Sequence, residues 1–279
     1  MADYEQRFLD AEQYMEACLT LGLQGKNAEA LKAIDKAIEC DPNFAEAFNK
    51  KGDVLFKLGR IQEALDCYLK SHELNPNIQN NYFDLGRSYL MLGDYTNAMQ
   101  NFTTAYQMKK QYEIHAFIGK IYFEQGDLKN AEDSFKNVLA ENDHQTMACY
   151  YMGLLELQNG NPDQAKGQFN KIIEKYSRIV RTKPDMAEAY YYLGKCHFFN
   201  GDYDKAIENL KLAIKYDTDE IDNHYSFDMF YSDAEAFAAL AEAQAKAGHI
   251  SEAKENILKA VSLEPNNKKL VDLKTKLGY

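Results

Sequence analysis

Six histidines and five cysteines are the side chains of this 279-residue sequence best suited to metal binding or nucleophilic chemistry. No two histidines lie four residues apart, and the zinc-protease motif His-Glu-x-x-His is absent. Cys196 and His197 are adjacent, so a helix would turn them about 100° apart, which does not suit a shared metal. The cysteines are odd in number, widely spaced and without a Cys-x-x-Cys pair, so they predict neither a zinc site nor a disulfide framework.

Two other motifs have a superficial likeness to ligand sites. The acidic run 217–222 resembles the start of a calcium loop, but Ile221 holds the fifth place and the glycine and closing glutamate of such a loop are missing. The Gly-Lys pairs at 119–120 and 194–195 lack the glycine-rich lead and the Ser/Thr of a phosphate-binding loop. We therefore predict no catalytic residue, no metal site, no cofactor and no enzyme activity.

The composition indicates a folded, acidic chain. Apolar residues make up 46% of it and charged residues 27%, and the formal net charge of −11 disfavours nucleic acid as a partner. The N-terminal residues contain no signal-peptide core, and no stretch reaches the roughly 20 apolar residues that span a bilayer. Together with cysteines typical of a reducing compartment, these features predict a cytoplasmic protein with no membrane partner.

Small residues recur along the chain at a nearly constant period. Glycines are spaced by 34, 34, 33, 34, 41 and 47 residues, and an alanine follows each of them five residues later. A second glycine stands seven residues before five of them. The spaced glycines are Gly25, Gly59, Gly93, Gly126, Gly160, Gly201 and Gly248. Such a period indicates an array of repeated units, each too small to fold alone.

The two recurring sets of glycines, which we call the glycine columns, predict pairs of helices. A glycine inside a helix is unfavourable by up to about 1 kcal/mol, so the earlier glycine is expected to allow close approach of a second helix. The later glycine suits the left-handed turn that ends a helix. Four polar residues are then placed to cap the second helix: Asp94, Asp127, Asn161 and Asp202. Pro162 suits a first turn, and the other four prolines stand where second helices should end.

These residues closely resemble the tetratricopeptide repeat (TPR) family. The unit that begins at Ala187, for example, carries the family pattern at Tyr190, Leu193-Gly194, Ala206, Leu210 and Ala213. The resemblance implies an all-α, right-handed TPR superhelix (α-α solenoid) of about seven helix-turn-helix repeats with a capping helix at residues 268–279. The expected repeats span 11–44, 45–78, 79–111, 112–145, 146–186, 187–220 and 234–267, after an N-terminal extension at 1–10.

Two departures from the repeat length are expected to have different structures. The fifth unit is seven residues too long, which is close to two helical turns, so we predict one second helix that continues to about Thr182. The insertion 221–233 has Tyr225, Phe227, Met229 and Tyr231 at period two, which is typical of an extended segment. It either fills a packing gap or gates the ligand site. Ser232 and Glu235 resemble a capping box, so a helix should begin directly after Ser232.

The family resemblance implies that the first helices line a concave groove that binds extended or helical peptides. By that resemblance, the candidate peptide-groove residues are Phe83, Arg87, Phe117, Lys120, Phe123, Tyr150, Tyr151, Tyr191, Tyr192, Lys195 and Phe198. Aromatic residues at helical spacing also suit core packing, so both roles stay open for them. The carboxylate clamp of chaperone-binding relatives and the asparagine ladder of sugar-transferase relatives are not matched.

The leading functional hypothesis is a scaffold or adaptor that binds a partly apolar peptide segment of another protein. A second hypothesis is a self-assembling scaffold, a homo-oligomer in which one copy fills the groove of another. A third, an enzyme or its regulatory arm, would require a separate domain that the repeats leave no room for.

Overall fold

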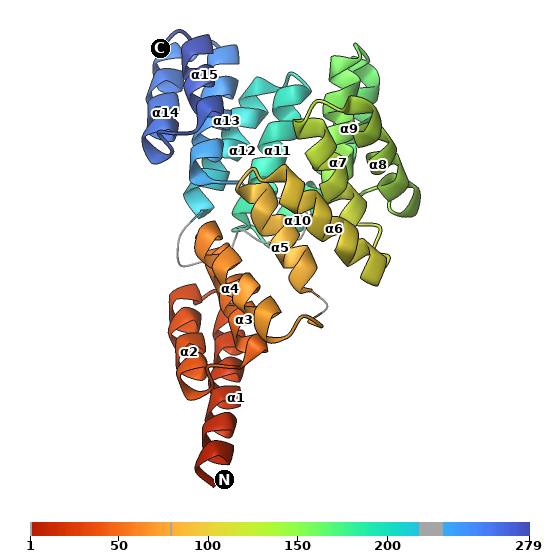
Figure 1. The fold of residues 1–279 in the computed structure, drawn as a ribbon. Helices are drawn as coiled ribbons and strands as arrows, with labels where there is room; N and C mark the ends of the chain where they lie inside the picture. Colours follow the sequence, from red (N-terminus) through yellow and green to blue (C-terminus); the bar gives the residue numbers. More distant parts are fainter. Residues whose placement is uncertain (1, 79, 218–230) are drawn as a thin grey trace. The chain divides into compact units, whose positions relative to one another are not determined.

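A computed structural model describes residues 2–78, 80–217 and 231–279, and all regular secondary structure in these ranges is α-helical. The described chain forms two compact units, one of residues 2–134 and the other of residues 135–217 and 231–279. The helices of Figure 1 are α1 (Ala2–Leu23), α2 (Asn27–Cys40), α3 (Ala45–Lys57), α4 (Ile61–Leu74), α5 (Asn81–Met91), α6 (Tyr95–Met108), α7 (Ile114–Glu124), α8 (Leu128–Glu141), α9 (Thr146–Gln158), α10 (Pro162–Thr182), α11 (Ala187–Phe199), α12 (Tyr203–Tyr216), α13 (Asp233–Lys246), α14 (Ile250–Leu263) and α15 (Lys268–Lys276).

Helices pack against their neighbours in sequence. In the first unit α1 packs on α2, α3 on α4 and α5 on α6, and α2 and α4 also contact the first helix of the next repeat. The second unit repeats this order from α9 to α14, and α15 packs on α14 and α13 (Figure 1). Leu270 of α15 is buried in one core with Phe237, Ile257 and Ala260. This pairwise order is the all-α repeat architecture that the sequence predicts.

The two glycine columns have the structural roles predicted for them. All seven spaced glycines have φ between 70° and 87°, the left-handed conformation that ends the first helix. Four of the earlier glycines each face a large side chain of the second helix: Gly52, Gly86, Gly153 and Gly194. A Cβ atom added to Gly52 would lie 2.6 Å from Tyr68 Cε1, and one added to Gly153 would lie 2.5 Å from Phe169 Cε1. A larger residue would therefore force the two helices apart.

The predicted caps form at two of the four positions. The side chain of Asp94 accepts a hydrogen bond from the Asn97 backbone nitrogen at 3.1 Å, and Asp127 accepts one from Asn130 at 3.2 Å. The prediction is wrong for Asn161 and Asp202, which make no capping bond. Asn161 Nδ2 instead donates to Glu156 Oε2 at 2.9 Å, and Asp202 Oδ2 lies 3.4 Å from His197 Nδ1. Each side chain is drawn back to the preceding helix.

The lengthened helix α10 ends at Thr182, as predicted. Phe169, Ile172 and Tyr176 are buried along one face, so the seven extra residues leave its apolar stripe continuous. Two lysines bind the helix to the start of α9 and to the turn before it. Lys171 Nζ donates to the carbonyl oxygen of Asp143 at 2.9 Å, and Lys175 Nζ donates to Thr146 Oγ1 at 2.6 Å.

Ala98 is fully buried, so a larger residue at this position tests how tightly its helix pair is packed. We expect Ala98→Leu to lower the free energy of unfolding by about 1–3 kcal/mol, since the added atoms overpack the pair. Gln100→Leu is the matched control, since Gln100 is exposed on the same helix. Its effect should stay within about 0.5 kcal/mol. Denaturant unfolding of both variants measures the difference, and equal effects would show that Ala98 does not lie at a tight interface.

Candidate functional site

In the first unit, side chains of three successive first helices form one cluster, which we call the α3–α5–α7 face. Its residues are Lys50, Asp53, Phe56, Phe83, Arg87 and Phe117. Phe56 and Phe117 are buried in it, and its other four residues are partly exposed. The Phe83 ring meets the Phe117 ring edge-on, with centroids 5.2 Å apart, and thereby joins α5 to α7. Arg87 lies over the rings of both Phe56 and Phe83, with the guanidinium carbon 4.3 Å and 5.7 Å from their centroids, and joins α5 to α3. The face therefore combines aromatic and charged groups.

The charged groups of this face are unequally paired. Lys50 Nζ lies 2.6 Å from Asp53 Oδ2, and the Tyr68 hydroxyl donates to the other oxygen of Asp53 at 3.0 Å. Arg87 Nη1 lies 4.0 Å from Asp84 Oδ1, which is too far for a hydrogen bond. The charge of Lys50 is thus closely neutralised, whereas that of Arg87 is not.

Asp84 belongs to a buried polar network that the sequence did not predict. Asn49 Nδ2 donates to Asn81 Oδ1 at 2.9 Å and approaches Asp84 Oδ2 at 3.3 Å. Asp84 is only 8% exposed. Burial, followed by the negative charge of Asp53, raises the pKa of the Asp84 carboxyl to about 7. The signal in the sequence that could have located Asp84 is its place in the repeat, two residues before the helical glycine Gly86.

The remaining candidates of the first unit lie on α7. Phe117 is 7% exposed, and its ring stacks on Phe102 at a centroid distance of 5.2 Å. Lys120 and Phe123 are partly exposed, one and two turns further along the helix. All five candidates of this unit are thus carried by the first helices α5 and α7, which the groove prediction requires; their contact with a ligand stays a prediction.

Four predicted groove tyrosines lie in the core of the second unit. Tyr150, Tyr151, Tyr191 and Tyr192 are 8%, 6%, 8% and 1% exposed. The Tyr151 ring stacks on Phe135 at 5.5 Å, and the Tyr192 ring stacks on Tyr176 at 5.5 Å. Burial raises the pKa of Tyr191 and Tyr192 well above the ordinary value. These rings therefore stabilise the unit in the structure, whatever part they take in binding.

Tyr231, at which the described part of the chain resumes after residue 217, packs on a predicted groove residue. Its ring is parallel to Tyr191, with centroids 4.0 Å apart and an angle of 6°, and it is 2% exposed. The next residue, Ser232, accepts a hydrogen bond from the Glu235 backbone nitrogen at 3.2 Å, which confirms the capping box and the start of α13. Residues 218–230 lie outside the described residues, so the gap-filling and gating hypotheses stay open.

Lys195 and Phe198, the other two candidates of the second unit, are partly exposed on α11. The Lys195 amine lies 5.4 Å from the Phe199 ring centroid, and the Phe198 ring meets Tyr203 at a centroid distance of 5.8 Å. Both side chains thus lie against aromatic neighbours close to the end of the helix.

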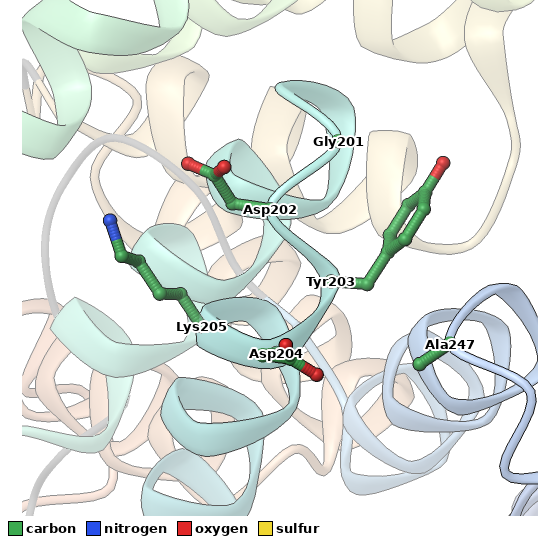
Figure 2. Close-up of a pocket in the computed structure, with 6 residues that line it drawn as sticks. All are labelled: Gly201, Asp202, Tyr203, Asp204, Lys205 and Ala247. Atoms are coloured by element: carbon green, nitrogen blue, oxygen red, sulfur yellow. The ribbon is translucent and has the colours of Figure 1, made fainter.

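A depression of about 400 Å³ lies at the turn between α11 and α12. Figure 2 shows its six lining residues: Gly201, Asp202, Tyr203, Asp204, Lys205 and Ala247. Five of them are consecutive residues that run from the turn into the start of α12, and Ala247 comes from the end of α13. The two carboxylates and the lysine are solvent-exposed. Because no buried polar group lines it, the depression lacks the convergent polar groups of a ligand site.

Metal-ligating side chains are scattered in the described ranges. Among these residues, no group of three His, Cys, Asp or Glu side chains is placed to hold a metal ion. Burial raises the pKa of the Cys18 and Cys67 thiols to about 11, so both are protonated at neutral pH and poor nucleophiles. Of the described helices, none is both long and apolar enough to cross a membrane.

Comparison with known families identifies the repeats. Tetratricopeptide repeat profiles match residues 45–78, 83–145, 150–220 and 234–267, and a further TPR repeat profile matches residues 23–59. The chain belongs to the tetratricopeptide repeat family. Its membership places it among protein–protein interaction scaffolds.

Similar curated proteins are longer than this chain. Mouse tetratricopeptide repeat protein 16 is 29% identical over 212 residues, which are 70% of this chain and 27% of that protein. Mouse BBSome complex member BBS4 is 25% identical over 227 residues, which are 72% of this chain and 44% of that protein. The chain therefore spans less than half of either relative.

Solved structures show the same fold. A tetratricopeptide repeat protein from Parabacteroides merdae has a TM-score of 0.60 at 17% identity and covers 97% of this chain and 100% of its own. The APC/C hetero-tetramer Cut9–Hcn1 has a TM-score of 0.59 at 16% identity and covers 95% of this chain and 55% of its own. At these identities the likeness concerns the fold alone.

Proposed function

We propose that the chain binds a peptide segment of a partner protein along its first helices, with the α3–α5–α7 face as the main anchor. The observation that carries this proposal is Arg87, a partly buried guanidinium held between Phe56 and Phe83 with no hydrogen-bond acceptor among the described residues. Aromatic residues and arginine supply most of the binding energy in protein interfaces, because they offer large contact areas and directed donors.

The second unit has a smaller part in this proposal. The four tyrosines predicted to contact the ligand are at least nine-tenths buried, and Tyr231 covers one ring face of Tyr191. A buried ring offers little surface to a peptide. Lys195 and Phe198, which are partly exposed, are the candidates of this unit that stay accessible.

Selection of random linear peptides displayed on phage against the whole chain tests the proposal. We expect recovered peptides to bind wild type at least about tenfold more tightly than Phe83→Ala, because buried aromatic anchors are each worth about 2 kcal/mol or more. Leu69→Ala is the control, since Leu69 is 42% exposed on the second helix α4. Melting curves establish that each variant is folded. Failure to recover any peptide, or equal affinity for Phe83→Ala and wild type, would refute the proposal.

A further inference from the structure

The Arg87 side chain lies against two aromatic rings, but its hydrogen-bond donors have no acceptor among the described residues. Its guanidinium lies 4.3 Å from the Phe56 ring centroid and 5.7 Å from that of Phe83, and its side chain is 17% exposed. The nearest carboxylate oxygen, of Asp84, is 4.0 Å away. A guanidinium has five N–H donors in one plane, and in the described chain none of them meets an acceptor at hydrogen-bond distance. The donors of this partly buried charge are therefore available to a further partner besides Asp84.

The surrounding charges define what that partner must be. Lys50 is neutralised by Asp53 at 2.6 Å. Asp84 is buried, receives the Asn49 amide on its other oxygen at 3.3 Å, and is only partly ionised at neutral pH because burial raises its pKa. The least compensated charge of the face is thus the positive charge of Arg87, whose nearest carboxylate oxygen, of Asp84, is 4.0 Å away. A group with one negative charge balances the charge of Arg87, whereas a phosphate carries nearly two negative charges.

We infer that Arg87 is the anchor for an acidic side chain, Asp or Glu, of the bound peptide segment. This inference rests on the proposed function and names the chemistry of its ligand. The planar fork of the guanidinium matches a carboxylate with two parallel hydrogen bonds, which the compact ammonium of lysine does not offer. The neighbouring ring of Phe83, which is partly exposed, would contact an apolar residue of the same segment.

The test compares peptides selected from random linear libraries on three forms of the whole chain: wild type, Arg87→Lys and Arg87→Gln. Arg181→Lys is the matched control, because Arg181 is an exposed arginine in the last turn of α10. We expect peptides retained by wild type and by Arg181→Lys to share one position occupied by Asp or Glu. Both Arg87 variants should lose that preference. Arg87→Lys keeps the positive charge, but it removes the planar guanidinium that forms two parallel hydrogen bonds with a carboxylate.

The affinities of individual peptides then show which chemical group supplies the negative charge that Arg87 binds. A recovered peptide with both ends blocked should lose at least about tenfold in affinity when its shared Asp or Glu becomes Asn or Gln, because the guanidinium is left unpaired. Replacement by phosphoserine should not improve binding. If affinity depends instead on a free C-terminal carboxylate or rises with phosphoserine, the assignment of an acidic side chain is wrong.

The outcomes also distinguish this inference from the proposed function. Peptides that bind wild type but show no acidic position, or that bind Arg87→Lys equally well, would overturn the role of Arg87 and leave groove binding intact. If no peptide is recovered on any form, the proposed function itself fails.

Discussion

Asp84→Asn should stabilise the protein at about pH 8 and leave it almost unchanged at about pH 4. The pKa of the Asp84 carboxyl is raised from 3.8 to about 7 in the folded chain, first by burial and then by Asp53, against the attraction of Arg87 and Lys50. The folded state therefore binds a proton that the unfolded state releases between these values. The contribution of Asp84 to stability is fully present below about pH 4 and is lost as the pH rises through about 7.

A shift of this size corresponds to roughly 4 kcal/mol, so we expect the variant to gain roughly 2–4 kcal/mol at about pH 8. Asparagine keeps an acceptor for the Asn49 amide and carries no charge that must be buried. Denaturant unfolding across the pH range measures the effect, and Asp133→Asn, at an exposed position of α8, is the control. A stability difference from wild type that is the same at both ends of the range would show that the Asp84 pKa is not raised.

Removal of the Tyr192 ring should destabilise the protein, whereas removal of its hydroxyl alone should not. The ring is 1% exposed, stacks on Tyr176 and meets Tyr191 edge-on. Tyr192→Ala should therefore lower the free energy of unfolding by roughly 3–5 kcal/mol, because it leaves a cavity in the core of the second unit.

Tyr192→Phe keeps the ring and removes a buried oxygen that has no hydrogen-bond partner within the described residues. An unsatisfied buried hydroxyl is unfavourable by about 1–3 kcal/mol, so this variant should be as stable as wild type or more stable. Denaturant unfolding of both variants gives the comparison. A large loss for Tyr192→Phe would reveal a partner for the hydroxyl, and a small loss for Tyr192→Ala would place the ring outside the core.

The register of the repeats was predictable because it depends on local steric requirements. A left-handed turn requires a residue such as Gly93, and close approach of two helices requires one such as Gly52, whatever the rest of the chain does. The end of α10 at Thr182 followed from the same periodicity, since two extra turns keep its apolar stripe in place.

The roles of the aromatic residues were not predictable from spacing, because a ring that faces the core and one that faces a ligand recur with the same helical period. Tyr151 and Tyr192 are buried through contacts with Phe135 and Tyr176, which lie 16 residues before them. The missing caps at Asn161 and Asp202 likewise depend on competing partners, Glu156 and His197, whose positions are fixed only in the folded chain. The packing of Tyr231 on Tyr191 is another contact between distant residues.

Hydroxyl-radical footprinting of the whole chain, with and without a peptide selected on it, locates the binding surface. We expect the peptide to protect Phe83 and Phe123, which are partly exposed on the first helices α5 and α7. Leu69 and Met108, 42% and 47% exposed on the second helices α4 and α6, should react equally in both samples. Protection of Leu69 and Met108 with unchanged Phe83 and Phe123 would contradict binding along the first helices.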